Sequence, residues 1–243
     1  MAPTIAFIHG GLHDGRCWAE TVDALRVLLP DVAAISVDLP GRSDGPGDLA
    51  SLTIEDCVHS VTKQIIERTD GETVVLVGHS LAGVLLSGVV QGLGIQRVAE
   101  VILVACCVPP TGASVLDTLP SVMKPVVGRF ARNSPVLYKF PPGWTRHFFG
   151  NRATRVQRTR IKAGLVPESS ALITELVTAS WPRSVRKSWV LTQRDRALPP
   201  SKQRGFIRNV GGVDKLVTID AGHEVMFTHP RELANVIVGL VDR

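Results

Sequence analysis

At 243 residues the chain fits one domain with room for a small insertion. Apolar residues make up 44 % of it and charged residues 20 %, which allows a sizeable core and excludes a disordered or collagen-like chain. The formal net charge of +5 is modest and no recognised nucleic-acid-binding module accompanies it, so we expect no nucleic-acid partner.

Short apolar runs alternate with helix-like segments over most of the chain. The predicted strands are, in chain order, residues 5–8, 32–37, 73–77, 98–104, 188–192 and 215–219. Segments that favour amphipathic helices lie at residues 18–29, 53–68, 80–91 and 231–241. Thr53 suits the N-cap of the second helix, whose apolar face would hold Val58, Val61, Ile65 and Ile66. Strands apolar on both faces, alternating with helices, predict an α/β fold with a mostly parallel sheet of about six strands and helices on both faces.

The alternation breaks between residues 108 and 186, where Pro, Arg and aromatic residues are frequent and only short helix-like pieces occur. Ligands of such sheets bind beyond the carboxyl ends of the strands, so an insertion that leaves from that edge would cover the site. We therefore predict a core formed by residues 1–107 and 187–243, with residues 108–186 inserted as a small, mainly helical cap.

The strongest motif is Gly-His-Ser-Leu-Ala at residues 78–82, between a predicted strand and a predicted helix. This is the context of a nucleophile elbow, a sharp turn that holds a serine in a strained conformation. The positions two before and two after the serine must be small, and here they are Gly78 and Ala82. The alternative is a chance occurrence of these residues at a strand–helix turn. We predict that Ser80 is a nucleophile.

A serine hydroxyl is a poor nucleophile near neutral pH and needs a base within hydrogen-bond reach. His223 directly follows the last predicted strand, and it is the only histidine after Ser80 at a strand end. His147 lies in the predicted cap, and His229 precedes Pro230 at the start of the last helix. We therefore predict that His223 is the base.

The imidazole of such a base needs an acid that fixes its tautomer and stabilises its cation. Asp195 follows the predicted strand at 188–192, and the chain order serine, aspartate, histidine is that of the α/β-hydrolase fold. The other aspartates are less well placed: Asp214 precedes its strand, Asp117 lies in the cap, and Asp220 is too near His223 in the sequence. We predict Asp195 as the acid and the α/β-hydrolase fold for the chain.

Acyl transfer develops an oxyanion that backbone N–H groups can stabilise. We expect one donor at Leu81, directly after the nucleophile, and the other at Gly11, in the loop after the first strand. The glycines of that loop let the backbone approach the substrate closely, so Gly10 is a candidate substrate contact. The loop lacks both G-x-G-x-x-G and the P-loop lysine, which argues against nucleotide binding.

Compartment and metal content are predicted from the N-terminal residues and the cysteines. The apolar run at residues 5–8 is too short for a signal sequence or a membrane span. No C-x-x-C pair and no Cys/His metal spacing occurs among the four cysteines, Cys17, Cys57, Cys106 and Cys107. We expect a reduced, cytoplasmic protein with no membrane span and no metal site.

The basic residues are unevenly distributed. No acidic residue occurs from Thr118 to Pro167, whereas lysines and arginines are frequent there. The interpretation we favour is a solvated, arginine-rich surface. The alternative is attraction of anionic substrates or of an acidic partner surface.

Taken together, the motifs resemble the plant methylesterase and hydroxynitrile lyase branch of the α/β hydrolases, and bacterial esterases similar to it. The resemblance covers nearly the whole chain and includes His9-Gly10-Gly11 with Trp18 downstream, Asp38-Leu39-Pro40-Gly41, Gly78-His79-Ser80-Leu81, Asp195 with Pro199 and Gln203, Ala221-Gly222-His223, His147-Phe148-Phe149-Gly150 and Leu165-Val166-Pro167-Glu168. It implies small ester or lactone substrates, no cofactor and a largely helical cap. It also implies substrate contacts at Gly10, Trp18 and Phe149.

Two positions separate lyases from esterases in that branch. The lyases carry a threonine after the histidine of the first loop and a lysine after the catalytic histidine, where this chain has Gly10 and Glu224. Lyase chemistry is therefore disfavoured. Glu224 also departs from the apolar residue common in the esterases; it either places a negative charge near the base or faces solvent.

The sequence thus predicts a serine hydrolase that cleaves a carboxylic ester or lactone of a small molecule through an acyl-enzyme. The alternatives keep the same three residues without hydrolysis: a hydroxynitrile lyase-like enzyme, a cofactor-free oxygenase or a ligand receptor. We expect a monomer or a homodimer.

Overall fold

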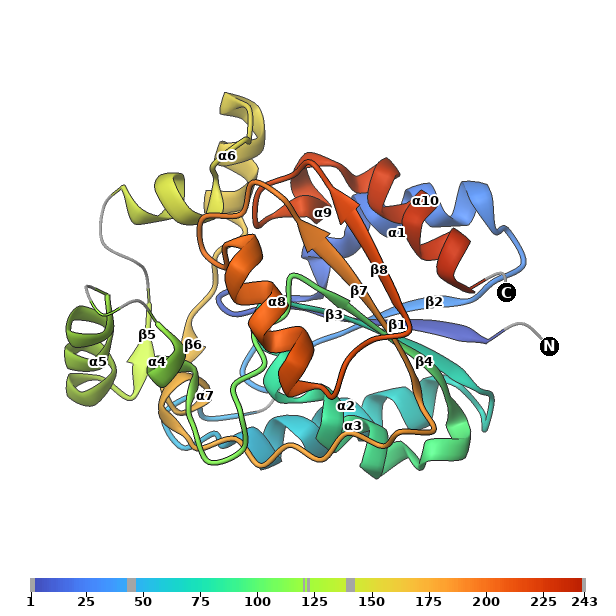
Figure 1. Cartoon of the computed structure of the whole chain (residues 1–243), viewed down its shortest axis with the longest axis horizontal. Coiled ribbons are helices and arrows are strands. Elements are labelled where there is room, and N and C mark those ends of the chain that lie inside the picture. Colours follow the sequence, from blue (N-terminus) through green and yellow to red (C-terminus); the bar gives the residue numbers. More distant parts are fainter. Residues whose placement is uncertain (1–2, 43–46, 120, 122, 139–142, 242–243) are drawn as a thin grey trace.

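The structure is a computed structural model, and it describes residues 3–42, 47–119, 121, 123–138 and 143–241. Its main sheet has six parallel strands in the order β2-β1-β3-β4-β7-β8 (Figure 1). In chain order these are β1 (Thr4–Ile8), β2 (Ala34–Val37), β3 (Val74–His79), β4 (Val98–Val104), β7 (Arg186–Thr192) and β8 (Lys215–Ile219). The predicted parallel sheet is confirmed, with strand ends that differ by one or two residues.

The strands are apolar on both faces because the sheet is covered on both sides. Successive side chains of a strand point to opposite faces, so Ile5 and Phe7 of β1 enter one apolar cluster while Ala6 and Ile8 enter the other. Helices α1 (Ala19–Leu28) and α10 (Pro230–Val241) cover the first face. Helices α2 (Ile54–Arg68), α3 (Leu86–Leu93) and α8 (Pro200–Asn209) cover the second.

Helix α2 begins as the sequence predicts. Thr53 caps it through its hydroxyl and backbone in a capping box with Asp56. Its buried face differs from the predicted one: Ile66 is 43 % exposed, whereas Cys57 is fully buried. The buried face is therefore turned slightly from the predicted one. The prediction differed because it gave no weight to cysteine, which packs as a small hydrophobe.

Two other elements differ from the prediction. The segment after β3 starts as a 3₁₀ turn, η2 (Ser80–Val84), and becomes regular only in α3. Helix α8 was not predicted from the sequence because its residues are mostly polar, although Phe206 and Val210 at its end are buried.

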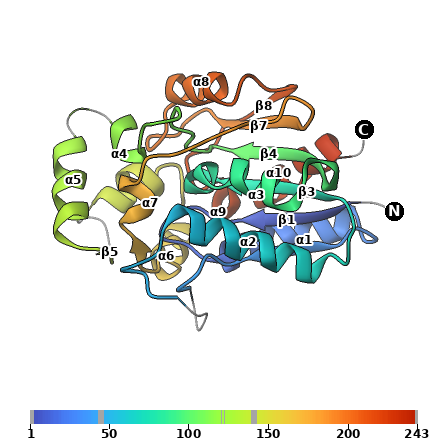
Figure 2. The same ribbon diagram turned by 90° about the horizontal axis from the view of Figure 1, so that it is seen from below.

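The chain between β4 and β7 holds only short elements. They are α4 (Val115–Thr118), α5 (Lys124–Asn133), β5 (Val136–Leu137), η4 (Thr145–Phe149), α6 (Arg155–Ala163), β6 (Glu168–Ser169) and α7 (Ala171–Thr174), with β5 and β6 pairing antiparallel. Both views show these elements at the end of the molecule opposite the N-terminus, beyond the carboxyl ends of the strands, whereas the chain after α7 returns toward the start of β7 (Figures 1 and 2). Among the described residues, no helix has the length and apolar character needed to cross a bilayer.

Gly83 of η2 lies where no side chain fits. A Cβ at this position would stand 2.3 Å from the carbonyl oxygen of Cys107, in the segment after β4. The same segment is held to the turn by Cys107 N, which donates to Ser80 O at 2.7 Å. The close approach of the two backbones therefore requires glycine at position 83.

We predict that Gly83→Ala lowers the free energy of unfolding by about 1–3 kcal/mol, because the added methyl forces the two segments apart. Urea unfolding followed by circular dichroism measures this. The matched control is Gly239→Ala in α10, where a Cβ would meet nothing within 4 Å. That variant should be as stable as the wild type or more stable by up to about 1 kcal/mol, because alanine is the better helix former. Equal midpoints for wild type and Gly83→Ala would contradict the prediction.

Candidate active site

Ser80 stands at the sharp turn between β3 and η2. Its φ is +50°, a left-handed conformation that is unfavourable for a residue with a side chain. Gly78 gives the turn its room, since a Cβ there would lie 2.8 Å from Leu86 Cδ1 and 3.2 Å from Ala82 Cβ. The turn therefore has the strained geometry of a nucleophile elbow.

A chain of hydrogen bonds joins Ser80 to two residues from other strand ends. Ser80 Oγ lies 2.8 Å from His223 Nε2, and His223 Nδ1 lies 2.7 Å from Asp195 Oδ2. Asp195 follows β7 and His223 follows β8, and both are buried. Because the Asp195 carboxylate accepts, Nδ1 carries the proton and Nε2 presents its lone pair to the serine hydroxyl.

The Asp195 carboxylate is held in place by its own loop. Thr192 Oγ1 donates to Oδ2 at 2.9 Å, and the backbone N–H of Leu198 donates to Oδ1 at 2.8 Å. Behind it, the fully buried Gln203 donates through Nε2 to Thr192 Oγ1 and to the Leu198 carbonyl. Gln203 entered the sequence analysis only as part of a motif, because nothing local shows that its amide braces the aspartate loop.

The protonation of His223 reflects opposing influences. Burial lowers its pKa, but the charge of Asp195, the hydrogen bond that His223 donates to Asp195 and the charge of Glu224 raise it, and the net direction is upward. The neighbouring His79 donates from Nε2 to the carbonyl oxygen of His223 at 3.0 Å. Burial, followed by the charge of His223, holds the pKa of His79 well below its usual value. His79 is therefore a neutral support and His223 the ring that gains the proton.

The loop after β1 lies against the elbow. A Cβ on Gly11 would stand 3.0 Å from Leu81 Cδ2, and both residues line the same cavity as Ser80. Gly10 was predicted to contact the substrate, but it does not line that cavity. A Cβ at position 10 would come within 2.9 Å of His79 Nδ1 and 3.0 Å of Ser80 Cβ, so glycine is needed for packing against the elbow.

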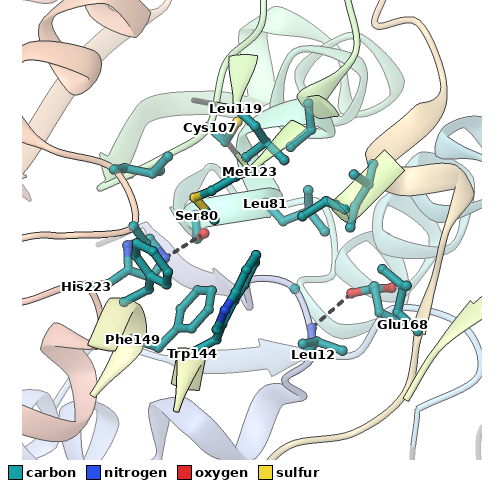
Figure 3. A pocket seen from close by; sticks show the side chains of 18 of the residues that line it. Leu12, Ser80, Leu81, Cys107, Leu119, Met123, Trp144, Phe149, Glu168 and His223 are labelled. Carbon is teal, nitrogen blue, oxygen red and sulfur yellow. Dashed lines mark hydrogen bonds between the residues drawn. The ribbon is translucent and has the colours of Figure 1, made fainter. Parts of the chain in front are cut away.

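A buried ion pair fastens this loop to the segment between β4 and β7. Arg42 Nη2 lies 2.5 Å from Glu168 Oε1, and the two residues are 2 % and 1 % exposed. Arg42 Nε also donates to the carbonyl of His13, and Leu12 N donates to Glu168 Oε2 at 3.1 Å (Figure 3). This pairing was not predicted from the sequence, since Arg42 and Glu168 are 126 positions apart in the chain.

Beside Ser80 lies a cavity of about 120 Å³. Figure 3 shows Ser80 and His223 at one side of it, with Phe149 and Trp144 close by. The ring of Phe149 stands 5.4 Å from that of His223, and Phe149 lines the cavity. The other apolar lining residues include Leu12, Leu81, Val115, Leu119, Met123, Val127, Leu137, Phe148, Ile173 and Leu198.

Trp18 is a correction to the predicted substrate contacts. It is 0 % exposed and does not line the cavity. Its ring packs 5.0 Å from that of Phe7 and meets the ring of His79 edge-on at 6.3 Å. Trp18 therefore belongs to the core beneath the site, because the loop that carries it turns back under β1.

The charged residues of the described cavity wall are acidic. Glu168 and Glu224 line it, and no Lys or Arg of the described chain does. Of the basic residues in the segment between β4 and β7, Arg152 pairs with Asp220 and Arg160 with Glu20 at the surface. This arrangement agrees with the solvated-surface interpretation of the basic run.

Known proteins similar to this chain include several named as esterases. It is 26 % identical to the probable esterase PIR7A of rice over 96 % of this chain and 94 % of that protein. It is likewise 26 % identical to a carbendazim hydrolyzing esterase of Nocardioides, over 96 % and 97 % of the two chains. Methylesterase 1 of Arabidopsis thaliana is 22 % identical over 97 % of this chain and 95 % of that protein.

Solved structures share the fold. An extracellular alpha/beta-hydrolase from a Paenibacillus species superposes with a TM-score of 0.81 at 22 % identity, covering 98 % of both chains. A pyrethroid hydrolase from Sphingobium faniae superposes with a TM-score of 0.79 at 21 % identity, covering 100 % of this chain and 98 % of that one. Residues 5–236 also match the sequence profile of the alpha/beta hydrolase family, and the protein belongs to that family.

Proposed function

We propose that the protein hydrolyses a carboxylic ester or lactone of a small molecule, with Ser80 as nucleophile, His223 as base and Asp195 as acid. The observation that carries the proposal is the hydrogen-bonded chain from a strained serine at a cavity wall to a buried histidine and carboxylate. The similarity to proteins named as esterases supports the same reaction class. These names favour hydrolysis over the alternatives without it.

In the proposed mechanism, Ser80 Oγ attacks the ester carbonyl while His223 Nε2 takes the hydroxyl proton. The N–H groups of Gly11 and Leu81 are the proposed donors to the oxyanion that forms. His223 then gives its proton to the leaving alcohol, which leaves an acyl-enzyme on Ser80. A water molecule, deprotonated by His223, attacks the acyl carbonyl. The bond between the acyl carbon and Ser80 Oγ then breaks, His223 returns the proton to Oγ, and the acid is released.

We infer that residues 108–186 act as a cap that shapes the acyl or alcohol pocket. The segment contributes aromatic and aliphatic side chains to the cavity wall, among them Met123, Trp144 and Phe148. A predominantly apolar wall favours substrates with an apolar body attached to the ester. Gly11, Leu81 and Phe149 are the residues we propose to contact that substrate.

We predict that Ser80→Ala lowers the rate of ester turnover by several orders of magnitude, because only binding and oxyanion stabilisation remain. Initial rates with a panel of p-nitrophenyl esters and lactones of increasing chain length measure this. The free energy of unfolding should not fall, since alanine tolerates the turn no worse than serine. Turnover within tenfold of the wild type would exclude Ser80 as the nucleophile.

We predict that Asp195→Asn lowers kcat by about 10³–10⁴, because the amide favours the wrong tautomer of His223. The pH profile gives a second readout. Protonated His223 cannot accept a proton, so kcat/KM falls as the pH drops through its pKa. The wild-type pKa is raised, which places this acidic limb above the ordinary histidine value of 6.5. Loss of the Asp195 charge should move the limb to lower pH.

The control for this variant is Asp23→Asn, which removes the same charge from an exposed side chain on α1. Its rate and pH profile should match those of the wild type. A nearly silent Asp195→Asn, together with a severe loss in Asp214→Asn or Asp117→Asn, would show that another aspartate is the acid.

A further inference from the structure

Glu224 is a buried acid in the wall of the cavity. It follows His223 directly, is 2 % exposed and lines the cavity next to Ser80. Of the two possibilities that the sequence left open, exposure to solvent is therefore excluded. The acid instead places its charge beside the base, where it contributes to raising the pKa of His223.

The carboxylate of Glu224 has no hydrogen-bond donor in the described part of the chain. Its Oε2 atom is buried without a partner. The Nε2 atom of His13 lies 3.8 Å from Oε2, which is too long for a hydrogen bond. That nitrogen is itself without a hydrogen-bond partner among the described residues. His13 Nδ1 donates to the carbonyl of Gly11 at 3.0 Å, so a neutral His13 turns a lone pair toward Glu224.

Glu168, the other carboxylate in the wall of the cavity, differs from Glu224 in its hydrogen bonds. Glu168 accepts from Arg42 and from the backbone N–H groups of Leu12 and Ser169, so its hydrogen-bonding capacity is used within the protein. Glu224 receives no such bond. Buried polar groups are nearly always paired, and one without a partner at a cavity wall marks a position where a ligand supplies the missing donor.

We propose that Glu224 determines substrate specificity by accepting a hydrogen bond from an O–H or N–H group of the substrate. The protein would then favour esters that carry such a donor close to the ester group over esters of the same shape without one. The rest of the wall is mostly apolar, and Glu168 already accepts three hydrogen bonds within the protein, so few other acceptors compete for the donor. This inference rests on the proposed ester hydrolysis.

The test compares three methyl esters that differ at one substituent next to the carbonyl: methyl mandelate with a hydroxyl, methyl 2-phenylpropionate with a methyl, and methyl α-methoxyphenylacetate with a methoxy group. Each enantiomer is assayed separately. The methyl group matches the hydroxyl in size, and the methoxy group keeps the oxygen but has no donor. The observable is the ratio of kcat/KM between the hydroxyl ester and each of the others.

In the wild type we expect the hydroxyl ester to be favoured over both others. In Glu224→Leu the preference should fall about tenfold to a hundredfold, the range for a lost hydrogen bond to a charged group. Glu224→Gln keeps an acceptor oxygen of the same shape, so it should retain part of the preference. Effects of either substitution on Ser80 and His223 act on all three esters and cancel in the ratio.

The matched control is Glu232→Gln, which removes a carboxylate from the exposed face of α10. It should leave the ratio at the wild-type value. Thermal unfolding of each variant identifies one that fails to fold, and the isosteric Glu224→Gln then carries the test.

An unchanged ratio in folded Glu224→Leu and Glu224→Gln, with turnover that still requires Ser80, would overturn the role of Glu224 and leave the proposed hydrolysis standing. A wild type without preference for the hydroxyl ester would have the same meaning. Absence of Ser80-dependent turnover on these esters and on the p-nitrophenyl panel would overturn the proposed function itself, and this inference with it.

Discussion

The parallel pairing of the sheet is the constraint on which the candidate site depends. Strands β3, β7 and β8 end at the same edge, and Ser80, Asp195 and His223 follow these ends directly or within a few residues. Ser80 and His223 are 143 positions apart in the chain, yet Ser80 Oγ and His223 Nε2 lie 2.8 Å from each other. The ladder hydrogen bonds that fix the strand register therefore also fix the distance between nucleophile and base. Close packing around the elbow, where Gly10 and Gly78 leave no space for a side chain, then sets the orientation of the serine.

The ion pair between Arg42 and Glu168 adds a second constraint. Removing two charges from water is costly, and it is offset only where both groups are fully hydrogen-bonded. Here Glu168 receives Arg42 and two backbone donors, and Arg42 Nε donates to the carbonyl of His13, so most of this requirement is met, although Arg42 Nη1 is buried without a partner among the described residues. The pair joins the loop after β1, the loop after β2 and the segment between β4 and β7. The wall of the cavity and the loop that carries Gly11 are thus held together as one unit.

Because the wall is apolar, the few charges around the cavity interact more strongly than they would in water. Burial alone would lower the pKa of His223, but the charges of Asp195 and Glu224 outweigh it. Glu224 therefore has two effects that arise from one carboxylate. It strengthens the base beside it, and it offers an acceptor to whatever occupies the cavity. A ligand group that donates to Glu224 interacts with the same negative charge that raises the pKa of His223. Ligand binding at Glu224 and the basicity of His223 are therefore coupled.

The sequence alone determined the strands, the elbow and the order of the three candidate residues, because each depends on a local pattern: apolar runs, small residues around Ser80, and a polar residue after a strand. What it left open depends on contacts between distant segments. Trp18 and Gly10 were expected at the substrate but pack beneath the elbow, and no local pattern distinguishes a residue that lines a cavity from one that lies one layer below it. Arg42 and Glu168 meet across 126 positions. The burial of Glu224 was likewise decided by the tertiary structure, because only the packed loops around it exclude water, and none of the residues that the structure describes donates to its carboxylate.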